Sequence, residues 1–228
     1  MKIKKLSLVV ILAIQGVLFA DSAIASKTPT DFTYSANMAL TSNYLWRGLT
    51  QTNDHAAIQG GIDLGYRGFY TGVSASNVEL AGYETIMEID LYGGYKGEIA
   101  NIGYDIGYIT YNYPKSATAL NFQEAYFGLS KNIDNLGLSA KYYLSTKAQD
   151  TYNKLNYYEL AAIYTLPYEF SLGATYGDYE DTGKNYSAKL SKSLGNFTAS
   201  IAYINFHANG ISGLSDDENV VGTVSVSF

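Results

Sequence analysis

The chain has 228 residues, no cysteine and a formal net charge of −6, with 21 acidic against 15 basic residues. The lack of cysteine excludes disulfides, thiolate metal sites and a cysteine nucleophile, and no basic stripe is present for a nucleic-acid partner. The composition includes 23 Tyr and 22 Gly but only three Pro. Because tyrosine favours strands and glycine marks bends within them, this composition predicts an all-β protein.

The first 25 residues have the three parts of a secretory signal peptide. Lysines stand among the first five residues, an apolar run extends from Leu6 to Phe19, and small residues follow up to Ala25. The apolar run of about 14 residues is shorter than the roughly 20 that a membrane-spanning helix needs. We expect cleavage after Ala25, which leaves residues 26–228 as one exported domain without a linker.

Twelve segments alternate apolar and polar residues with the period of two that is typical of strands. They lie near residues 32–41, 58–66, 69–76, 87–95, 102–109, 122–130, 136–146, 155–166, 170–179, 185–191, 197–206 and 219–228. The count predicts a barrel of about twelve strands, with 10 or 14 left open. An even number would place both ends of the chain on the same side, which for an outer-membrane barrel is the periplasmic side.

Eight charged residues of these segments share the polar parity, and the uncharged Gln59 lies on it too. The eight are Asp63, Glu88, Asp90, Asp105, Glu124, Lys141, Glu159 and Lys189. Arg47 would join them if the first strand continued in register beyond Thr41. The rest of this face is mostly Gly, Ser, Thr, Asn and Tyr, whereas a soluble surface carries about 25 to 35% charged residues. The pattern therefore favours a transmembrane antiparallel β-barrel, apolar outside and polar inside, over a soluble β-sandwich or lipocalin-like barrel.

The connections alternate between short and long, as in outer-membrane barrels. The predicted short set is 67–68, 97–101, 131–135, 167–169 and 192–196, and the other set is 43–56, 78–84, 114–121, 147–154, 180–184 and 207–218. The last segment, "VVGTVSVSF", ends on Phe228 with no polar tail. We expect it to pair with the first strand, and its terminal phenylalanine resembles the signal by which the envelope's barrel-assembly machinery recognises its clients.

One stretch resembles a known family. "SNYLWRGLTQTNDHAAIQGGIDLGYRGFYTGVSASNV" is similar to the opening block of the TorF-like porins of bacteria. The match is carried by Tyr44, Arg47, Gly48, Gln51, Gln59, Gly60, Gly61, Asp63, Gly68, Phe69, Tyr70, Gly72, Ser76 and Asn77. Later pieces such as "EIDLYGGY" and "NFQEAYFGLS" continue it. The resemblance implies a porin-like barrel in the outer membrane of a Gram-negative bacterium, in contact with outer-membrane lipid, and names no solute.

Three functions are compatible with such a barrel. The first is a channel for passive diffusion of small hydrophilic solutes, which the small inward residues favour; they include Gly61, Gly72, Ser74, Gly103 and Gly107. The second is a closed structural or adhesive barrel, and whether the first loop plugs the lumen is left open. The third is a barrel enzyme, which needs a nucleophile within reach of a base. His55 and His207 both lie in predicted loops, so we expect no catalysis, and we expect no cofactor or metal site.

The remaining expectations concern aromatic side chains and charge. Interfacial girdles would take Tyr34, Trp46, Tyr66, Tyr95, Tyr104, Tyr164, Tyr176 and Tyr186. Tyr111, Tyr113, Tyr143 and Tyr157 have inward parity near strand ends, where they could stack against a ring-bearing solute. The inward residues comprise six acids against Arg47, Lys141 and Lys189, which predicts a weak preference for cations.

Overall fold

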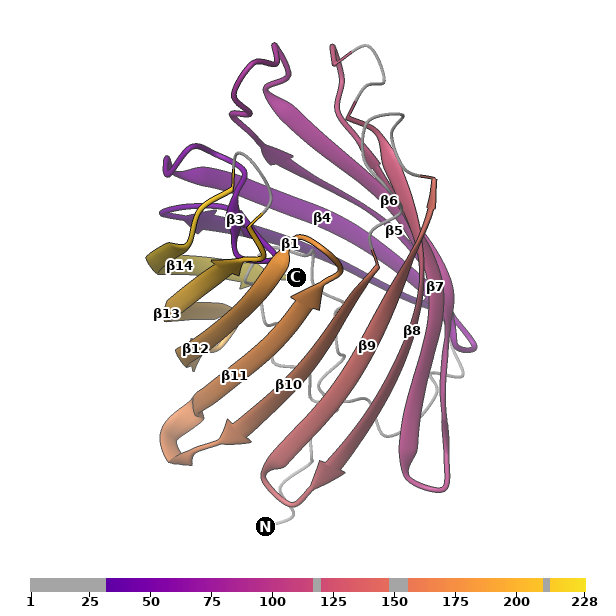
Figure 1. Ribbon diagram of the computed structural model, residues 1–228. Helices are drawn as coiled ribbons and strands as arrows, with labels where there is room; N and C mark the ends of the chain where they lie inside the picture. Colours follow the sequence, from indigo (N-terminus) through magenta and orange to yellow (C-terminus); the bar gives the residue numbers. More distant parts are fainter. Residues whose placement is uncertain (1–31, 117–119, 148–155, 211–213) are drawn as a thin grey trace.

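A computed structural model describes residues 32–116, 120–147, 156–210 and 214–228. The predicted signal peptide lies outside these residues. Twelve long strands close into one antiparallel barrel (Figure 1), which confirms the predicted fold and strand number. They are β1 (Phe32–Thr41), β4 (Ala57–Tyr66), β5 (Phe69–Asn77), β6 (Met87–Ile99), β7 (Ile102–Asn112), β8 (Phe122–Ile133), β9 (Leu136–Lys147), β10 (Tyr157–Thr165), β11 (Phe170–Tyr179), β12 (Gly183–Leu194), β13 (Phe197–Ala208) and β14 (Asp217–Ser227).

The barrel closes where β14 pairs with β1, as expected from the sequence. The ladder runs from Asn37 opposite Ser227 to Thr41 opposite Thr223. Phe228 extends it, because its backbone N–H donates to the carbonyl of Ala36 over 2.8 Å and its carbonyl accepts from Ala36 over 3.2 Å. Closure leaves no strand edge with unpaired N–H and C=O groups, which a sheet surrounded by lipid requires.

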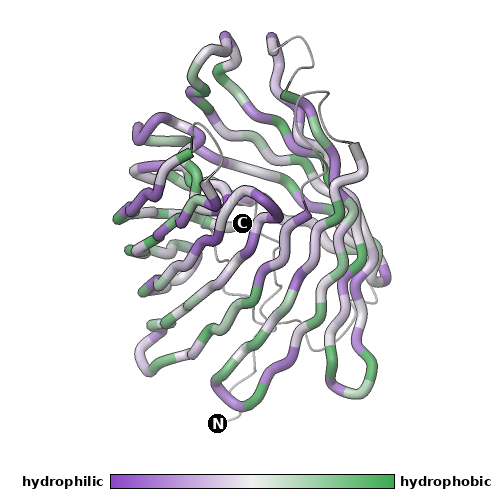
Figure 2. Tube along the Cα trace, in the orientation of Figure 1, coloured by the Kyte–Doolittle hydropathy of each residue, from purple (hydrophilic) through white to green (hydrophobic). Residues whose placement is uncertain are grey.

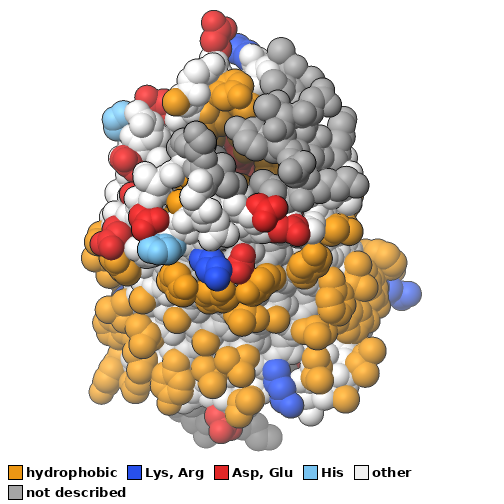
Figure 3. All heavy atoms as spheres, viewed as in Figure 1, with side chains coloured by type: hydrophobic (Ala, Val, Ile, Leu, Met, Phe, Trp, Pro, Cys, Tyr) orange, Lys and Arg blue, Asp and Glu red, His pale blue; other side chains and the backbone are white. Residues whose placement is uncertain are grey.

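The exterior is apolar and the interior polar, because side chains alternate between the two faces of each strand. Figure 2 shows hydrophobic and hydrophilic residues interspersed along the strands. Outward residues such as Ile62, Leu91 and Ile106 are more than half exposed. In the face drawn in Figure 3, hydrophobic side chains form a belt, and acidic and histidine side chains gather above it. This is the surface of a transmembrane barrel. Among the described residues, no helix is long and apolar enough to span a membrane.

Tight turns occupy one end of the barrel, called here the short-turn end. Arg67-Gly68 and Ala100-Asn101 are two-residue turns in which both residues have positive φ, the backbone of the hairpin turns whose twist matches the flanking strands. The strands run further than the sequence suggested, since Gly97 belongs to β6, Lys131 to β8 and Lys192 to β12. Most connections at the opposite end are longer, and the longest that is fully described is loop 1, residues 42–56.

Candidate functional site: the lumen and loop 1

Loop 1 folds into the lumen, which answers the question that the sequence left open. Its residues form a small hairpin of β2 (Leu45–Trp46) and β3 (Leu49–Thr50). Leu45 is buried in a cluster with Ala202 and Ile204 of β13 and Val221 of β14. Arg47 therefore reaches the interior through this hairpin and not through a first strand continued in register, because β1 ends at Thr41.

The turn of the hairpin is Arg47-Gly48, with φ of 52° and 84°. Two-residue turns with both φ positive favour Asn-Gly, and a long side chain at the first position is uncommon. Gly48 also lies close to the far wall, since a Cβ there would stand 2.9 Å from the Cβ of Asn185 and 3.1 Å from that of Phe206. The turn thus explains Gly48 but gives no local reason for an arginine beside it.

Contacts made by the Arg47 side chain supply the reason. Its Nη2 donates to both carboxylate oxygens of Glu124 on β8, over 2.9 and 2.7 Å, and the two side chains are only 2% and 1% exposed. The guanidinium carbon lies 4.2 Å from the ring centre of Trp46, 4.2 Å from Tyr157, 4.9 Å from Tyr179 and 5.2 Å from Tyr143. These distances are within the range of cation–π attraction. We call the four rings and Glu124 the Arg47 cage.

Three of the four rings come from a row of tyrosines on consecutive strands. Tyr126, Tyr143, Tyr157 and Tyr179 stand opposite one another on β8 to β11, with ring centres 5.7, 5.9 and 6.0 Å apart. Two of them belong to Tyr-Tyr pairs in the sequence, in which one ring points inward and the other outward because the strand period is two. Trp46 of loop 1 completes the cage, edge-on to Tyr179 at 5.5 Å.

Three acids lie on the wall formed by β4 and β6. Glu88 accepts a hydrogen bond from the Tyr44 hydroxyl of loop 1 over 2.6 Å. Asp90 accepts one from Ser74 over 3.2 Å, and Asp63 one from the Tyr92 hydroxyl over 2.6 Å. These donors are neutral, so each carboxylate that is ionised keeps its charge in the lumen. We call Asp63, Glu88 and Asp90 the acidic wall.

The remaining inward charges are partly paired. Lys141 lies 3.5 Å from Asp105, and Asp105 also accepts from the Tyr70 hydroxyl over 2.6 Å. Lys96 stands 5.5 Å from the centre of the Tyr70 ring. Lys96 was not among the residues predicted to line the lumen, although it shares the parity of Glu88 and Asp90 on the same strand.

The structure places all ten residues predicted to line the lumen on the inner side of the barrel. Gln59 and Lys189 are buried there, and Glu159 accepts from the Tyr157 hydroxyl over 3.2 Å. Arg47 and Glu124 are brought together, as are Asp105 and Lys141, whereas the acidic wall lies on other strands.

Tyrosine rings fill the space that the small inward residues were expected to leave. A Cβ on Gly72 would lie 2.4 Å from the Tyr92 ring, one on Gly107 would lie 2.4 Å from Tyr126, and one on Gly94 would lie 2.5 Å from the Tyr70 hydroxyl. In each pair the ring comes from the residue directly opposite on the neighbouring strand. At these glycines the opposite tyrosine ring occupies the space that a side chain would take, so the glycines do not widen the lumen.

The aromatic assignments from the sequence are right for most strand residues and wrong for the tryptophan. Tyr34, Tyr66, Tyr164 and Tyr186 are exposed on the outer face, where girdle residues belong. Trp46, predicted for a girdle, lies in the lumen. Tyr111, Tyr113, Tyr143 and Tyr157 are inside as expected, but all four are buried beside or beneath loop 1.

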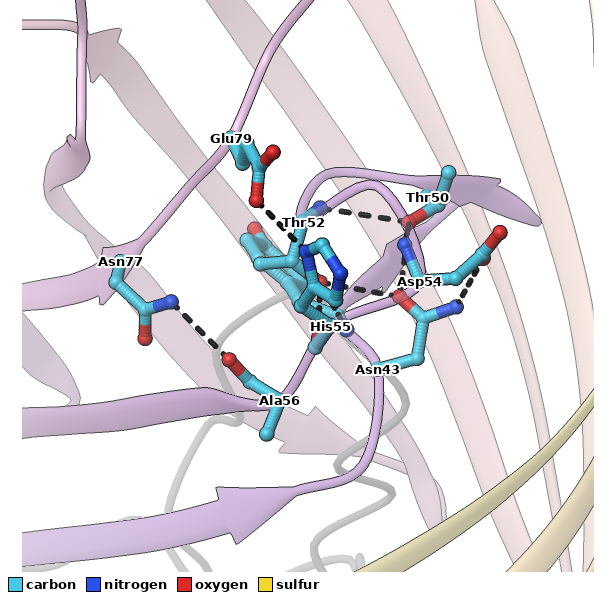
Figure 4. Close-up of polar contacts among 9 residues, drawn as sticks. Asn43, Thr50, Thr52, Asp54, His55, Ala56, Asn77 and Glu79 are labelled. Carbon is cyan, nitrogen blue, oxygen red and sulfur yellow. Dashed lines mark hydrogen bonds and ion pairs between the residues drawn. The ribbon is translucent and has the colours of Figure 1, made fainter.

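The base of loop 1 is held by polar contacts that centre on Asn43 (Figure 4). Its side-chain amide donates to Asp54 over 2.8 Å and to Asn219 of β14 over 3.1 Å, and it accepts from the Thr50 hydroxyl over 2.8 Å. The Thr52 hydroxyl donates to the carbonyl of His55 over 2.6 Å. Loop 1 is therefore an ordered structural element with its own hydrogen-bond network.

A second contact ties loop 1 to the connection between β5 and β6. The ring Nδ1 of His55 lies 2.8 Å from the carboxylate of Glu79, and both side chains are well exposed. The hydrogen bond with His55 holds the pKa of the Glu79 carboxyl below its ordinary value of 4.5. Since the folded pKa is the lower one, the contact stabilises loop 1 above pH 4.5 and is lost as pH falls through the lowered pKa.

We expect the variant His55→Ala to raise the pKa of Glu79 to the ordinary glutamate range, because the hydrogen bond with His55 is the main cause of the lowered pKa. Carbon NMR of labelled glutamate carboxyls, with the Glu79 signal assigned from its loss in Glu79→Gln, measures this shift. His207→Ala, which alters the other exposed histidine, is the control and should leave Glu79 unchanged. An identical Glu79 titration in wild type and His55→Ala would contradict the assigned contact.

Neither histidine is part of a nucleophile–base arrangement among the described residues. His55 contacts Glu79, and His207 places its Nδ1 2.9 Å from Asp216 on the exposed rim. Within the same part of the chain, no group of three His, Cys, Asp or Glu side chains is placed to hold a metal ion.

Comparison with solved structures shows the same fold. The barrel is similar to the KdgM porin, with a TM-score of 0.62, 14% identity, and coverage of 85% of this chain and 99% of that one. It is also similar to the NanC porin, with a TM-score of 0.57, 13% identity, and coverage of 86% of this chain and 99% of that one. The outer-membrane phospholipase of Salmonella typhi has a TM-score of 0.53 and 13% identity, with coverage of 94% of this chain and 98% of that one. Another matching KdgM structure is in complex with oligogalacturonate.

Sequence comparison assigns the family. A search of curated proteins finds no match. A family model described as "Bacterial protein of unknown function (Gcw_chp)" matches residues 25–226, which include every strand of the barrel up to Val226. The chain therefore belongs to the Gcw_chp family of bacterial proteins.

Proposed function

We propose that this protein is an outer-membrane channel of the porin type, through which small hydrophilic solutes diffuse past loop 1. The observation that carries the proposal is a lumen lined by charged side chains inside an apolar exterior. Burying ionised groups costs several kcal/mol each before pairing, so a barrel that served only as a scaffold would be more stable with an apolar interior. Similarity of fold to the KdgM and NanC porins supports the proposal.

The proposal includes a cellular location. The signal-peptide pattern of residues 1–25 would direct export, and the barrel would then insert into the outer membrane of a Gram-negative bacterium. Its short-turn end and both ends of the barrel domain would face the periplasm, with loop 1 entering from the outside. Membership of the TorF-like porins is part of the same proposal and rests on the "YLWRGLTQ" and "QGGIDLGYRGFY" segments.

A closed barrel is the second candidate, and one observation favours it. Loop 1 crosses the lumen and buries Arg47 against Glu124, so a solute would have to pass a constriction held by an ion pair and four rings. A barrel enzyme has weaker support, although a phospholipase shares the fold, because neither histidine approaches a nucleophile in the described residues.

Single-channel recording in a planar bilayer separates these functions. The refolded wild type is expected to show small, discrete conductance steps, and a variant with loop 1 residues 45–50 replaced by a short glycine-serine linker should show larger ones. Empty bilayers and heat-unfolded protein are the controls. If neither protein conducts although both are folded and inserted, the barrel is closed and the channel proposal fails.

Selectivity should be weakly in favour of cations. With Lys96 added, the inward bases are Arg47, Lys96, Lys141 and Lys189, against the six acids predicted to face inward. The unbalanced formal charge in the lumen is therefore negative. Acidic side chains that line a pore favour cations, and salt screens their field beyond about 8 Å at physiological ionic strength. The reversal potential across a salt gradient measures the preference, which should be larger at low salt. Anion preference in wild type, or no change in Glu88→Gln/Asp90→Asn, would refute the role of the acidic wall.

The terminal phenylalanine is proposed to act in assembly. Phe228 is exposed on the lipid side, and its backbone completes the pairing of β14 with β1. Phe228→Lys should reduce the amount of heat-modifiable barrel in the outer membrane, because it removes both the apolar anchor and the group that the assembly machinery would recognise. Phe197→Lys, an equally outward position on β13, is the control for charge alone. Equal loss in both variants would argue against a terminal recognition signal.

A further inference from the structure

The Arg47 cage has the composition of a receptor for an organic cation. Four electron-rich ring faces or edges stand within 5.2 Å of one planar cation, and a carboxylate supplies the counter-charge at 2.7 Å. Aromatic rings gathered around a single cationic group are the arrangement by which proteins bind guanidinium and quaternary ammonium ligands. Three of the four rings and the carboxylate come from β8 to β11, and loop 1 contributes Trp46 and the cation.

Arg47 is a constrained occupant of this cage. It holds a left-handed backbone conformation, with φ of 52°, that is unfavourable for a non-glycine residue, at a turn position where asparagine is favoured. Its pairing with Glu124 is also incomplete, because a single nitrogen, Nη2, serves both carboxylate oxygens. A free guanidinium could present two nitrogens to the two oxygens, which is the stronger geometry for this pair.

The part of the lumen beside the cage contains acidic side chains, which when ionised carry the sign of charge that attracts a cation. The acidic wall lies on β4 and β6, and Tyr44 of loop 1 bonds to Glu88 on that wall. Low-dielectric walls strengthen the attraction of such groups for cations and raise their local concentration. Neutral solutes gain nothing from these charges, and anions are repelled by Glu124 inside the cage.

We propose that the cage is a binding site for solutes that carry a guanidinium or a substituted ammonium group, and that Arg47 occupies it until such a solute displaces it. The proposal deepens the channel function above and rests on it for the route by which solutes arrive. Displacement would separate the Arg47 side chain from Glu124 while Trp46 keeps its contacts with the rings of Tyr111, Phe122 and Tyr179, so the solute that binds also loosens the turn of the hairpin.

Binding can be measured without conduction, because Trp46 is the single tryptophan of the chain and is itself a wall of the cage. The test uses refolded Arg47→Asn protein, in which the side chain that fills the cage is gone and the turn has its favoured Asn-Gly sequence. Trp46 emission is followed during titration with methylguanidinium and, separately, with methylurea, which has a similar shape and no charge. Ionic strength is kept constant with sodium chloride.

Methylguanidinium is expected to give a saturable change with half-saturation at about 1 to 10 mM, the range of a weak single-group ligand. In wild type the tethered Arg47 competes at a high effective concentration, so half-saturation should be at least about 10-fold higher. Adding Glu124→Gln to Arg47→Asn should weaken binding by at least about 10-fold as well, and methylurea should give no saturable change.

Equal responses to methylguanidinium and methylurea in folded Arg47→Asn protein, or binding that is independent of Glu124, would overturn the proposal. If Arg47→Asn does not fold, Arg47→Gly decides in the same way, since glycine adopts positive φ without strain. Binding in a protein that never conducts would leave the cage assigned and refute the channel, so the two proposals fail separately.

Discussion

Glu124→Gln is expected to expel loop 1 from the lumen. The substitution keeps the shape of the side chain but leaves the buried Arg47 guanidinium without its counter-charge. Breaking a buried ion pair by removing one partner costs about 3 to 5 kcal/mol, and about 3 kcal/mol already shifts an equilibrium roughly 100-fold. The barrel itself is held by the ladders of twelve strands, so we expect the loss to appear as undocking of the hairpin and not as global unfolding.

Trp46 emission measures this undocking. In wild type the indole packs edge-on against Tyr111, Phe122 and Tyr179, and in Glu124→Gln its emission should move to longer wavelength and become accessible to acrylamide. The matched control is Arg47→Met/Glu124→Leu, which removes both charges and leaves apolar groups of similar size. Such replacements of a complete pair are often neutral. Wild-type emission in Glu124→Gln, with the barrel still folded, would show that the ion pair does not hold the loop.

Ile62→Arg should destabilise the whole barrel. Ile62 lies at the middle of β4 on the lipid side and is 55% exposed. An arginine on the lipid face costs about 2 to 4 kcal/mol at the bilayer midplane and about 0 to 1 kcal/mol near the interfaces. Unfolding in lipid vesicles by guanidinium chloride, followed by heat modifiability, gives the change in the free energy of unfolding.

Ile58→Arg is the control for Ile62→Arg, because it changes the same residue type on the same face of β4 but near the end of the strand. It should cost at least about 1 kcal/mol less, since the cost depends on depth in the bilayer. Equal effects at the two positions would mean that Ile62 does not face hydrocarbon, and would contradict the placement of the membrane around the barrel.

The strands and their faces could be predicted from the sequence because their signal is local. A strand reveals its lipid side by the parity of residues such as Ile62 and Leu91, and the same parity places Glu88 and Asp90 inside. Lys96 obeys the same rule and could have been found with it. The boundaries between strands and short turns were predicted less accurately. Gly97 and Lys131 are residue types that are common in turns, but both are paired in the ladders of β6 and β8.

Loop 1 could not be placed by these rules, because parity holds only inside a strand. Trp46 was therefore assigned to a girdle by its type alone. The contact that fixes the loop joins Arg47 to Glu124, which is 77 positions away, and no local pattern encodes such a distance. The "RG" of "YLWRGLTQ" gave no such signal, because the same dipeptide forms the tight turn Arg67-Gly68, where the arginine is exposed.

The tyrosine rings that lie over Gly72, Gly94 and Gly107 also fix how the strands are aligned. A slip of two residues between neighbouring strands keeps every side chain on its proper face, so lipid exposure alone does not forbid it. Such a slip of β6 along β5 would set the Tyr92 ring against Tyr70 or Ser74 in place of Gly72. On β8, the same slip would set Tyr126 against Asp105 or Ile109. Each glycine thus leaves space for one tyrosine ring from the neighbouring strand. Together these pairs fix the stagger of the strands, and hence the diameter at which the barrel closes.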